Sequence, residues 1–198
     1  MNVVALIPHY NHAATVGQVA QAMRAQGLPV LIVDDGSEPA AQQILRDLAA
    51  ADAQIQVVWR AQNGGKGAAV KSGFAAAAAA GHSHVLQVDA DAQHQLADAQ
   101  KLLQAAFRQP EALVCAEPVY GADAPKSRLY GRKITNFWIW VNTGSRDIRD
   151  GMCGFRLYPL APVQALMQRH HIGERMDFDT DILVRLYWAG VPMVWVPT

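Results

Sequence analysis

Two aspartates one residue apart, Asp89 and Asp91, carry the clearest chemical signal in this sequence. They follow a short apolar run, residues 85–88, whose length and β-branched content predict a buried strand. Side chains at alternate positions of an extended segment point the same way, so both carboxylates are expected to converge on one small cation. Hard oxygen ligands suit Mg²⁺ or Mn²⁺, and such ions usually complete their coordination with substrate phosphates. We therefore predict a metal and diphosphate site at the carboxyl end of this strand.

Two residues just beyond these aspartates extend the same hypothesis. Gln93 and His94 follow within reach and are candidates for a third ligand or a phosphate contact. The alternative interpretation is a solvated turn, because acidic residues are common at strand ends.

Other polar residues follow the neighbouring apolar runs. Residues 30–33 are followed by Asp34 and Asp35, and acids at the end of an early strand often accept hydrogen bonds from a ribose or a base. An ordinary capped turn is the alternative. Residues 63–67, Asn-Gly-Gly-Lys-Gly, resemble a phosphate loop at a helix N-terminus but lack the Walker spacing. Lys66 is therefore expected either to contact the substrate or to close the turn.

The elements that position these residues alternate along the first part of the chain. Apolar runs predict strands and amphipathic or alanine-rich runs predict helices, at 3–7, 16–26, 30–33, 39–51, 55–59, 66–80, 85–88, 95–108 and 112–116. This repetition favours an α/β fold of Rossmann-like type, with a mostly parallel, doubly wound sheet and helices on both faces.

The pattern changes after residue 116. Residues 117–133 look loop-like and basic, and residues 134–141 are rich in aromatic side chains. One interpretation is a surface that meets anionic, partly apolar material such as a lipid phosphate at a membrane face. The other is an amphipathic core helix with cations at its N-terminal flank.

Three further charged residues are candidates near the C-terminal end. Arg156 is a candidate for a forked phosphate contact. Asp179 and Asp181 stand near the start of a helix predicted at 178–189, where the helix dipole favours carboxylates, and capping alone would explain both. A last strand is predicted at 193–196.

Composition excludes several classes of protein. The 198 residues are 51% hydrophobic and 17% charged, which suits one folded domain rather than a disordered chain. Because 17 basic residues balance 17 acidic ones, no global attraction to nucleic acid is expected. Cys115 and Cys153 fit no metal spacing and are expected as free thiols. With no signal peptide and no bilayer-spanning run predicted, we expect a cytoplasmic protein.

Five motifs occur in a fixed order along the chain. They are Leu-Ile-Pro-His-Tyr-Asn at 6–11, Val-Asp-Asp-Gly-Ser at 33–37, Asn-Gly-Gly-Lys-Gly at 63–67, Asp-Ala-Asp-Ala-Gln-His at 89–94 and Gly-Phe-Arg at 154–156. Together they resemble the inverting family 2 glycosyltransferases of GT-A fold, closest to the dolichol-phosphate mannosyltransferase-like branch. The resemblance covers nearly the whole chain. It implies one GT-A domain over 1–198, with a nucleotide-sugar-binding half at 1–116 and an acceptor-side half at 117–198.

The resemblance also implies roles for individual residues. Substrate binding would fall to Pro8, Tyr10, Asp34, Asp35, Lys66, Asp89, Ala90 and Arg132. A Mg²⁺ or Mn²⁺ cofactor would be held by Asp89, Asp91 and Gln93. The catalytic residues, on the acceptor side, would be Asp150, Arg156, Asp179 and Asp181.

The implied reaction moves a sugar from a nucleotide-diphosphate sugar to an acceptor, with inversion of configuration. The acceptor would be a polyprenyl phosphate or a lipid-linked hydroxyl, met at the inner face of a membrane through peripheral contact. A lipid phosphate is already an anion and needs no general base. A hydroxyl would need Asp150, Asp179 or Asp181 to take its proton.

Three departures from the family pattern bear on these expectations. His12 stands where the family usually has Glu, which leaves the donor preference open. Residues 117–119, Glu-Pro-Val, replace a Gly-Ser-Arg that relatives often show. The sequence also stops at a strand where many relatives continue, which suggests a short member or a truncated product.

Two other functions compete with sugar transfer. A nucleotidyltransferase would share the sheet and the metal-held phosphates, but it would usually carry a glycine-rich loop with Arg and Lys after the first strand. That position here reads Pro-His-Tyr-Asn-His, residues 8–12. A donor-binding module that has lost catalysis is the second alternative.

Overall fold

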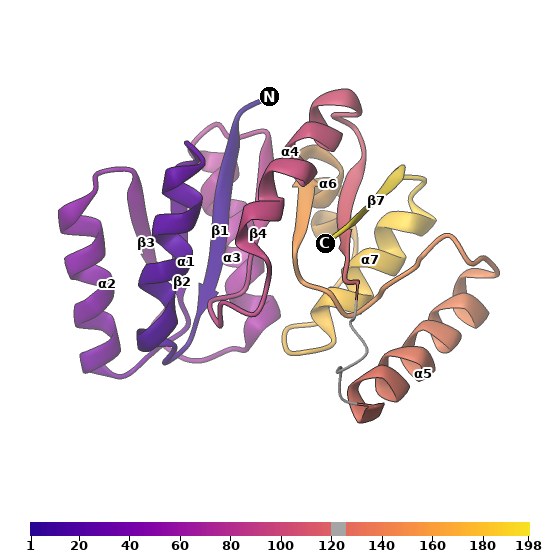
Figure 1. The fold of residues 1–198 in the computed structure, drawn as a ribbon, viewed down its shortest axis with the longest axis horizontal. Helices are drawn as coiled ribbons and strands as arrows, with labels where there is room; N and C mark the ends of the chain where they lie inside the picture. Colours follow the sequence, from indigo (N-terminus) through magenta and orange to yellow (C-terminus); the bar gives the residue numbers. More distant parts are fainter. Residues whose placement is uncertain (120–125) are drawn as a thin grey trace.

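The structure is a computed structural model that describes residues 1–119 and 126–198, except for the side chains of residues 126–129. Within these ranges, seven strands form one sheet in the order β3-β2-β1-β4-β6-β5-β7 (Figure 1). The strands are β1 (Val3–His9), β2 (Val30–Asp34), β3 (Ile55–Trp59), β4 (His84–Gln87), β5 (Leu113–Glu117), β6 (Arg156–Pro159) and β7 (Met193–Pro197). Only β6 runs antiparallel to its neighbours, β4 and β5.

Helices cover both faces of this sheet. They are α1 (Ala13–Ala25), α2 (Pro39–Ala51), α3 (Lys66–Ala79), α4 (Ala99–Arg108), α5 (Lys126–Thr143), α6 (Leu160–Arg169) and α7 (Phe178–Trp188), with a 3₁₀ turn at Leu96–Asp98 before α4. The described chain thus confirms the predicted α/β class with a mostly parallel sheet. None of the helices in the described ranges combines the length and the apolar character needed to cross a bilayer.

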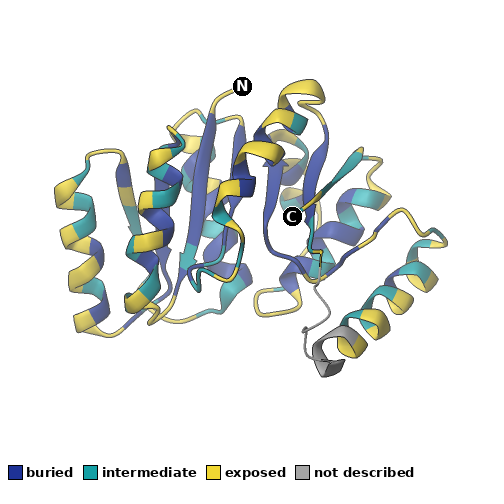
Figure 2. Cartoon of the chain, viewed as in Figure 1, coloured by how far each residue is buried: buried dark blue, intermediate teal, exposed yellow. Residues whose placement is uncertain are grey.

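The alternation of side chains along β1 builds two hydrophobic cores. Val3, Ala5 and Ile7 face one side of the sheet and pack in the core shared with α1, α2 and α4. Val4 and Leu6 face the other side and join the core formed with α3, α6 and α7. The central strands between these layers are buried almost throughout, whereas the edge strands β3 and β7 are only partly buried (Figure 2). Burial on both faces explains why the central strands read as continuous apolar runs.

Three predicted details were wrong. The strand before the paired aspartates ends at Gln87 rather than Val88, and the chain turns at residues 90–91. The premise that Asp89 and Asp91 lie in extended backbone therefore fails. Strand β6 was not predicted, although Phe155 and Leu157 alternate with polar residues as in a strand.

The third wrong detail concerns the basic segment 117–133. Its residues 126–133 belong to α5, since charged residues such as lysine and arginine are good helix formers. Residues 120–125 of that segment lie outside the described residues. Figure 1 shows α5 standing away from the sheet, and its closest helical neighbour is α7.

The close approach of α3 to β1 can be tested at one glycine. A Cβ added to Gly73 would lie 2.3 Å from Cδ1 of the buried Leu6. We expect Gly73→Ala to lower the free energy of unfolding by about 1 kcal/mol, because overpacking strain outweighs the gain in helix propensity.

Gly17 in α1 provides the matched control, because its Cβ would meet Leu48 at an ordinary 3.7 Å. Gly17→Ala should raise the free energy of unfolding by about 0.5–1 kcal/mol in urea denaturation. Stabilisation at both positions would contradict the tight packing of α3 on β1.

Candidate active site

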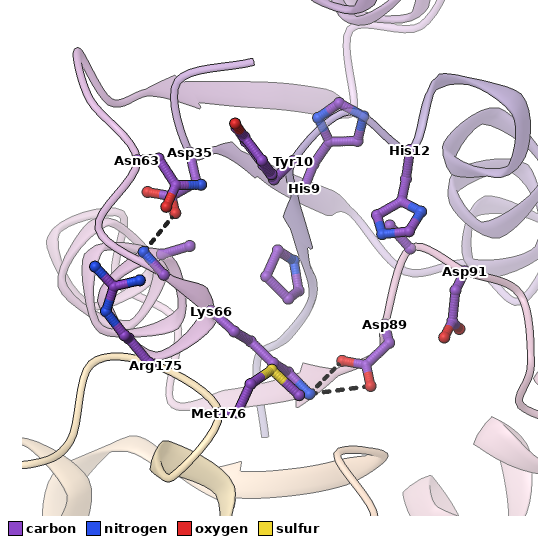
Figure 3. A pocket seen from close by; sticks show the side chains of 14 residues that line it. His9, Tyr10, His12, Asp35, Asn63, Lys66, Asp89, Asp91, Arg175 and Met176 are labelled. Carbon is purple, nitrogen blue, oxygen red and sulfur yellow. Dashed lines mark hydrogen bonds and ion pairs between the residues drawn. The ribbon is translucent and has the colours of Figure 1, made fainter.

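One pocket of about 450 Å³ opens where β1, β2 and β4 end, and we call it the central pocket. Parallel strands bring their carboxyl ends to one edge of a sheet, so the motifs after these strands meet there. Its lining is Pro8, His9, Tyr10, His12, Asp35, Asn63, Gly65, Lys66, Ala69, Asp89, Ala90, Asp91, Arg175 and Met176 (Figure 3). Seven of these were predicted as site residues: Pro8, Tyr10, Asp35, Lys66, Asp89, Ala90 and Asp91.

A lysine at the start of α3 joins two aspartates from distant parts of the chain. The Nζ of Lys66 lies 2.8 Å from Oδ1 of Asp89 and 2.7 Å from Oδ2 of Asp179. Gln87, the last residue of β4, donates its amide hydrogen to the other oxygen of Asp179 at 3.0 Å. These contacts fix the starts of α3 and α7 against the end of β4.

The charges in this group decide the protonation of its members. Burial alone would lower the pKa of Lys66, but Asp89 and Asp179 outweigh it and raise that pKa above its ordinary value. Burial would raise the pKa of Asp89, but hydrogen bonds and charges from His94 and Lys66 outweigh it, so that pKa lies below its ordinary 3.8. The site therefore holds an ammonium and a carboxylate across the physiological pH range.

Gly154, in the turn before β6, leaves room for this group. A Cβ at that position would lie 2.7 Å from Nζ of Lys66 and 3.0 Å from both Oδ2 of Asp89 and Nε2 of Gln87. Any side chain would displace the ammonium from between its carboxylates. The Gly-Phe-Arg motif thus acts on the site through the space that its glycine leaves.

The two acids after β2 have different surroundings. Asp35 accepts hydrogen bonds from the backbone N–H groups of Gly64 and Gly65 and pairs with Arg60, so it holds the glycine loop beside the pocket. Asp34 does not line the central pocket. It is fully buried and lies 3.0 Å from Nδ1 of His9.

Neighbouring groups hold the buried Asp34–His9 pair in place. The backbone N–H of Ser37 donates to Oδ2 of Asp34. Burial lowers the pKa of His9 in spite of the nearby carboxylate. Asp34 therefore supports the β1 and β2 loops from behind the pocket.

Arg156 occupies a different place from the one predicted. Its guanidinium is fully buried and donates to the backbone carbonyl oxygens of Asp179 and Gly151, beside the buried hydroxyl of Tyr158. It does not line the central pocket, so the structure shows no phosphate fork there. Instead it fixes the backbone that presents Asp179.

The remaining predicted residues lie outside the central pocket. Asp150 is buried, pairs with Arg132 and accepts a hydrogen bond from the N–H of Met152. Asp181 pairs with Arg185 at 2.6 Å and faces α5 rather than the pocket. The backbone N–H of the exposed Gln93 donates to Oδ1 of Asp91 at 3.0 Å.

Pocket residues that sequence reasoning did not assign to the site include His9, Asn63, Arg175 and Met176. Asn63 stands in a motif that was recognised, and its position next to Gly64 was the available signal. Arg175 and Met176 lie in a loop between α6 and α7 that carries no motif. Only the packing of that loop against α3 brings them to the pocket.

The donor atoms of the pocket fit a divalent cation that relies on its substrate. Among the described residues, no group of three or more His, Cys, Asp or Glu side chains is arranged to hold a metal ion. Asp89 and Asp91 nevertheless both line the pocket and offer hard oxygen atoms. Mg²⁺ and similar ions are often held by one or two carboxylates, with phosphates and water as further ligands. The two residues therefore fit such an ion when a diphosphate is bound.

Solved structures define the class of this fold. Glucosyl-3-phosphoglycerate synthase from Mycobacterium tuberculosis, in complex with UDP, has a TM-score of 0.74 at 14% identity over 99% of this chain and 69% of that one. Mannosyltransferase PcManGT from Pyrobaculum calidifontis, in complex with GDP-Man and Mn²⁺, has a TM-score of 0.67 at 14% identity. That match covers 99% of this chain and 55% of the mannosyltransferase chain. The fold is therefore that of the GT-A glycosyltransferases.

Residues 4–174 match Glycosyl transferase family 2, and the chain belongs to that family. Dolichyl-phosphate beta-glucosyltransferase ALG5D of Trichomonas vaginalis is 28% identical over 78% of this chain and 49% of the relative. Polyprenol monophosphomannose synthase of Mycolicibacterium smegmatis is 29% identical over 97% of this chain and 74% of the relative. The chain spans about half the length of the Trichomonas relative. The names of these relatives agree with the resemblance to the dolichol-phosphate mannosyltransferase-like branch of the family.

The lysine between the two carboxylates makes stability depend on pH. Lys66→Met leaves Asp89 and Asp179 close together without their cation. We expect it to lower the free energy of unfolding at pH 7 by about 2 kcal/mol, less than for a sealed ion pair because the side chain of Asp89 is 25% exposed. Because the wild-type pKa of Asp89 is depressed, the wild type loses this advantage as pH falls below about 4.

Urea denaturation of both proteins between pH 7 and pH 3 measures this difference. Arg149→Met is the control, since Arg149 and Glu117 form a pair whose side chains are 57% and 35% exposed, and its loss should change stability by less than about 0.5 kcal/mol. If the free energy of unfolding of Lys66→Met falls further below that of the wild type as the pH is lowered, the assigned charges are wrong.

Proposed function

We propose that this glycosyltransferase moves a sugar from a nucleotide-diphosphate sugar to the phosphate group of a polyprenyl lipid, in a metal-supported reaction that inverts the anomeric centre. The observation that supports this acceptor is that the three candidate bases, Asp150, Asp179 and Asp181, are already paired with cations and hydrogen-bond donors. Residues 1–116 supply most of the donor pocket, and residues 117–198 supply the acceptor side.

The central pocket is the proposed donor site. Asp35 and Tyr10 lie at one end of its lining and Asp89 and Asp91 at the other, a span that suits a nucleoside diphosphate, and Pro8 also lines the pocket. A divalent cation held by Asp89 and Asp91 would neutralise charge that develops on the leaving nucleoside diphosphate. Mn²⁺ and GDP-Man in the Pyrobaculum enzyme, and UDP in the Mycobacterium enzyme, support this assignment.

The engaged carboxylates favour an acceptor that is already an anion. A hydroxyl acceptor needs a positioned base, and Asp179 would have to give up Lys66 or Gln87 to take a proton. Asp150 would have to give up Arg132, and Asp181 faces away from the pocket with Arg185. A phosphate monoester needs no such base. Its oxygen would attack the anomeric carbon from the face opposite the leaving group, which inverts the configuration.

Helix α5 provides a surface for a lipid acceptor. Its exposed apolar side chains are Tyr130, Ile134, Phe137, Trp138 and Val141. Lys133 lies over the ring of Tyr130 at 5.9 Å, so cations and aromatic groups are mixed on this helix. Such a surface suits the headgroup region of an anionic membrane, where aromatic rings and basic groups are both favoured.

A groove of about 510 Å³ lies between α5 and α7, beside the start of the helix that carries Asp179. Ile134, Trp138 and Trp188 line it, and so does Thr180, the residue next to Asp179. An isoprenoid chain lying there would place its phosphate near Asp179 and Asp150. The relatives named for dolichyl, polyprenol and undecaprenyl phosphate support this class of acceptor.

A transfer assay tests the proposed function. Purified protein is incubated with labelled UDP-, GDP- or dTDP-sugars, Mn²⁺ and either polyprenyl phosphate or the matching polyprenol. We expect lipid-linked product from the phosphate at a rate about 100-fold or more above that from the alcohol, because no free base serves a hydroxyl. Chelation of the metal, or Asp91→Asn in the presence of metal, should abolish transfer, and NMR of the product should show an inverted anomer.

Other outcomes of the assay would reject specific parts of the proposal. Equal transfer to the alcohol would reject the phosphate acceptor. Donor binding without transfer to any acceptor would identify a binding module, and release of pyrophosphate would identify nucleotidyl transfer. Full activity of Asp91→Asn would reject its role in holding the metal.

Membrane contact through α5 has a separate test. We expect sedimentation with vesicles that contain anionic phosphatidylglycerol, and weaker sedimentation with neutral phosphatidylcholine vesicles. Phe137→Ser should weaken binding about fivefold, which corresponds to the lost transfer of one aromatic ring into the interface. Phe107→Ser removes an equally exposed ring from α4 and should change nothing. The same loss in both variants would reject α5 as the contact surface.

A further inference from the structure

The loop of residues 170–177 forms one wall of the central pocket, although no motif marks it. It joins α6 to α7 and brings Arg175 and Met176 into the lining. In Figure 3 the side chain of Arg175 lies on the side of Asn63, across the pocket from Asp91. A ligand that spans the pocket would therefore pass between Arg175 and the aspartates after β4.

Hydrogen bonds donated by residues of α3 hold this loop in place. The N–H of Ala68 donates to the carbonyl oxygen of Glu174 at 2.9 Å, and Nζ of Lys71 donates to the carbonyl oxygen of Ile172 at 3.0 Å. A Cβ on Gly65 would lie only 2.7 Å from the oxygen of Glu174 and 2.9 Å from Cγ of Arg175. The stem of Arg175 is thus packed directly on the glycine loop that faces the pocket.

The charges around the pocket give Arg175 a distinct place. The lining contains three carboxylates, of Asp35, Asp89 and Asp91, against the cations of Lys66 and Arg175. Lys66 is shared between Asp89 and Asp179. Among the residues that the structure describes, the guanidinium of Arg175 is exposed and forms no ion pair. Asp35 is paired with Arg60 and Asp89 with Lys66, so within the described lining Arg175 is the cation not neutralised by a carboxylate, and its charge can meet a polyanionic ligand.

We propose that Arg175 binds the diphosphate of the donor, an inference that rests on the proposed function. A guanidinium offers two parallel N–H groups that match two phosphate oxygens. The loop also leads directly into the start of α7, where Asp179 holds Lys66. Arg175 would thus contact the donor phosphates from the side of the pocket opposite Asp89 and Asp91.

Calorimetry with a series of ligands tests this role. Wild type, Arg175→Ala and Arg175→Lys are titrated in Mn²⁺ with nucleoside, nucleoside monophosphate and nucleoside diphosphate of uridine and of guanosine. For the diphosphate that the wild type binds, we expect Arg175→Ala to weaken affinity about 10- to 100-fold, the range for one or two lost charge-assisted hydrogen bonds. Affinity for the nucleoside should stay within about twofold, and Arg175→Lys should restore part of the loss, because it keeps the charge without the fork.

The controls separate this role from others. Arg108→Ala removes an exposed arginine at the end of α4 and should leave every affinity unchanged. Equal losses for nucleoside and diphosphate in Arg175→Ala would show a structural or base-binding role and overturn the inference. Unchanged diphosphate binding would also overturn it while leaving the proposed function intact. A wild type that binds neither diphosphate would overturn both.

Discussion

The ammonium of Lys66, held between the carboxylates of Asp89 and Asp179, is the interaction on which the rest of the site depends. It joins three elements that are remote in sequence: the end of β4, the start of α3 and the start of α7. The pocket is open on one side, so these charges stay partly hydrated, and their pairing costs less than it would in a sealed core. Gly154 leaves the space in which the ammonium of Lys66 lies, and Arg156 fixes the backbone that presents Asp179.

The sequence was sufficient to predict the sheet and the edge at which the site lies. Continuous apolar runs such as 3–7 and 30–33 are typical of strands buried on both faces, and polar residues follow them at the carboxyl end. This pattern predicts that Asp35, Lys66 and Asp89 lie together at one edge of the sheet. This prediction does not depend on detailed side-chain geometry, because in open α/β sheets the pocket lies at the carboxyl ends of the parallel strands.

The apolar pattern of the sequence does not predict in which direction a polar side chain points. Asp179 and Asp181 looked equivalent at a helix start, yet residues two apart on a helix point to different sides, so one meets Lys66 and the other Arg185. Arg156 looked like a phosphate ligand because it is charged, whereas its burial comes from β6, an antiparallel strand that the apolar pattern did not reveal. No sequence motif includes Arg175, because its position in the pocket depends on a tertiary contact with α3.

The antiparallel strand β6 has a consequence for how the acceptor side can vary. Val114 of β5 pairs with Leu157 of β6, so the chain that leaves the sheet after β5 rejoins it directly beside that strand. Part of the chain between β5 and β6 is fixed, because Asp150, Cys153 and Phe155 are buried and Gly154 leaves the space for Lys66. The exposed side chains of α5 can vary without moving any strand. Under the proposed function, the surface for the lipid can therefore diversify on α5 while the pocket around Lys66 keeps its geometry.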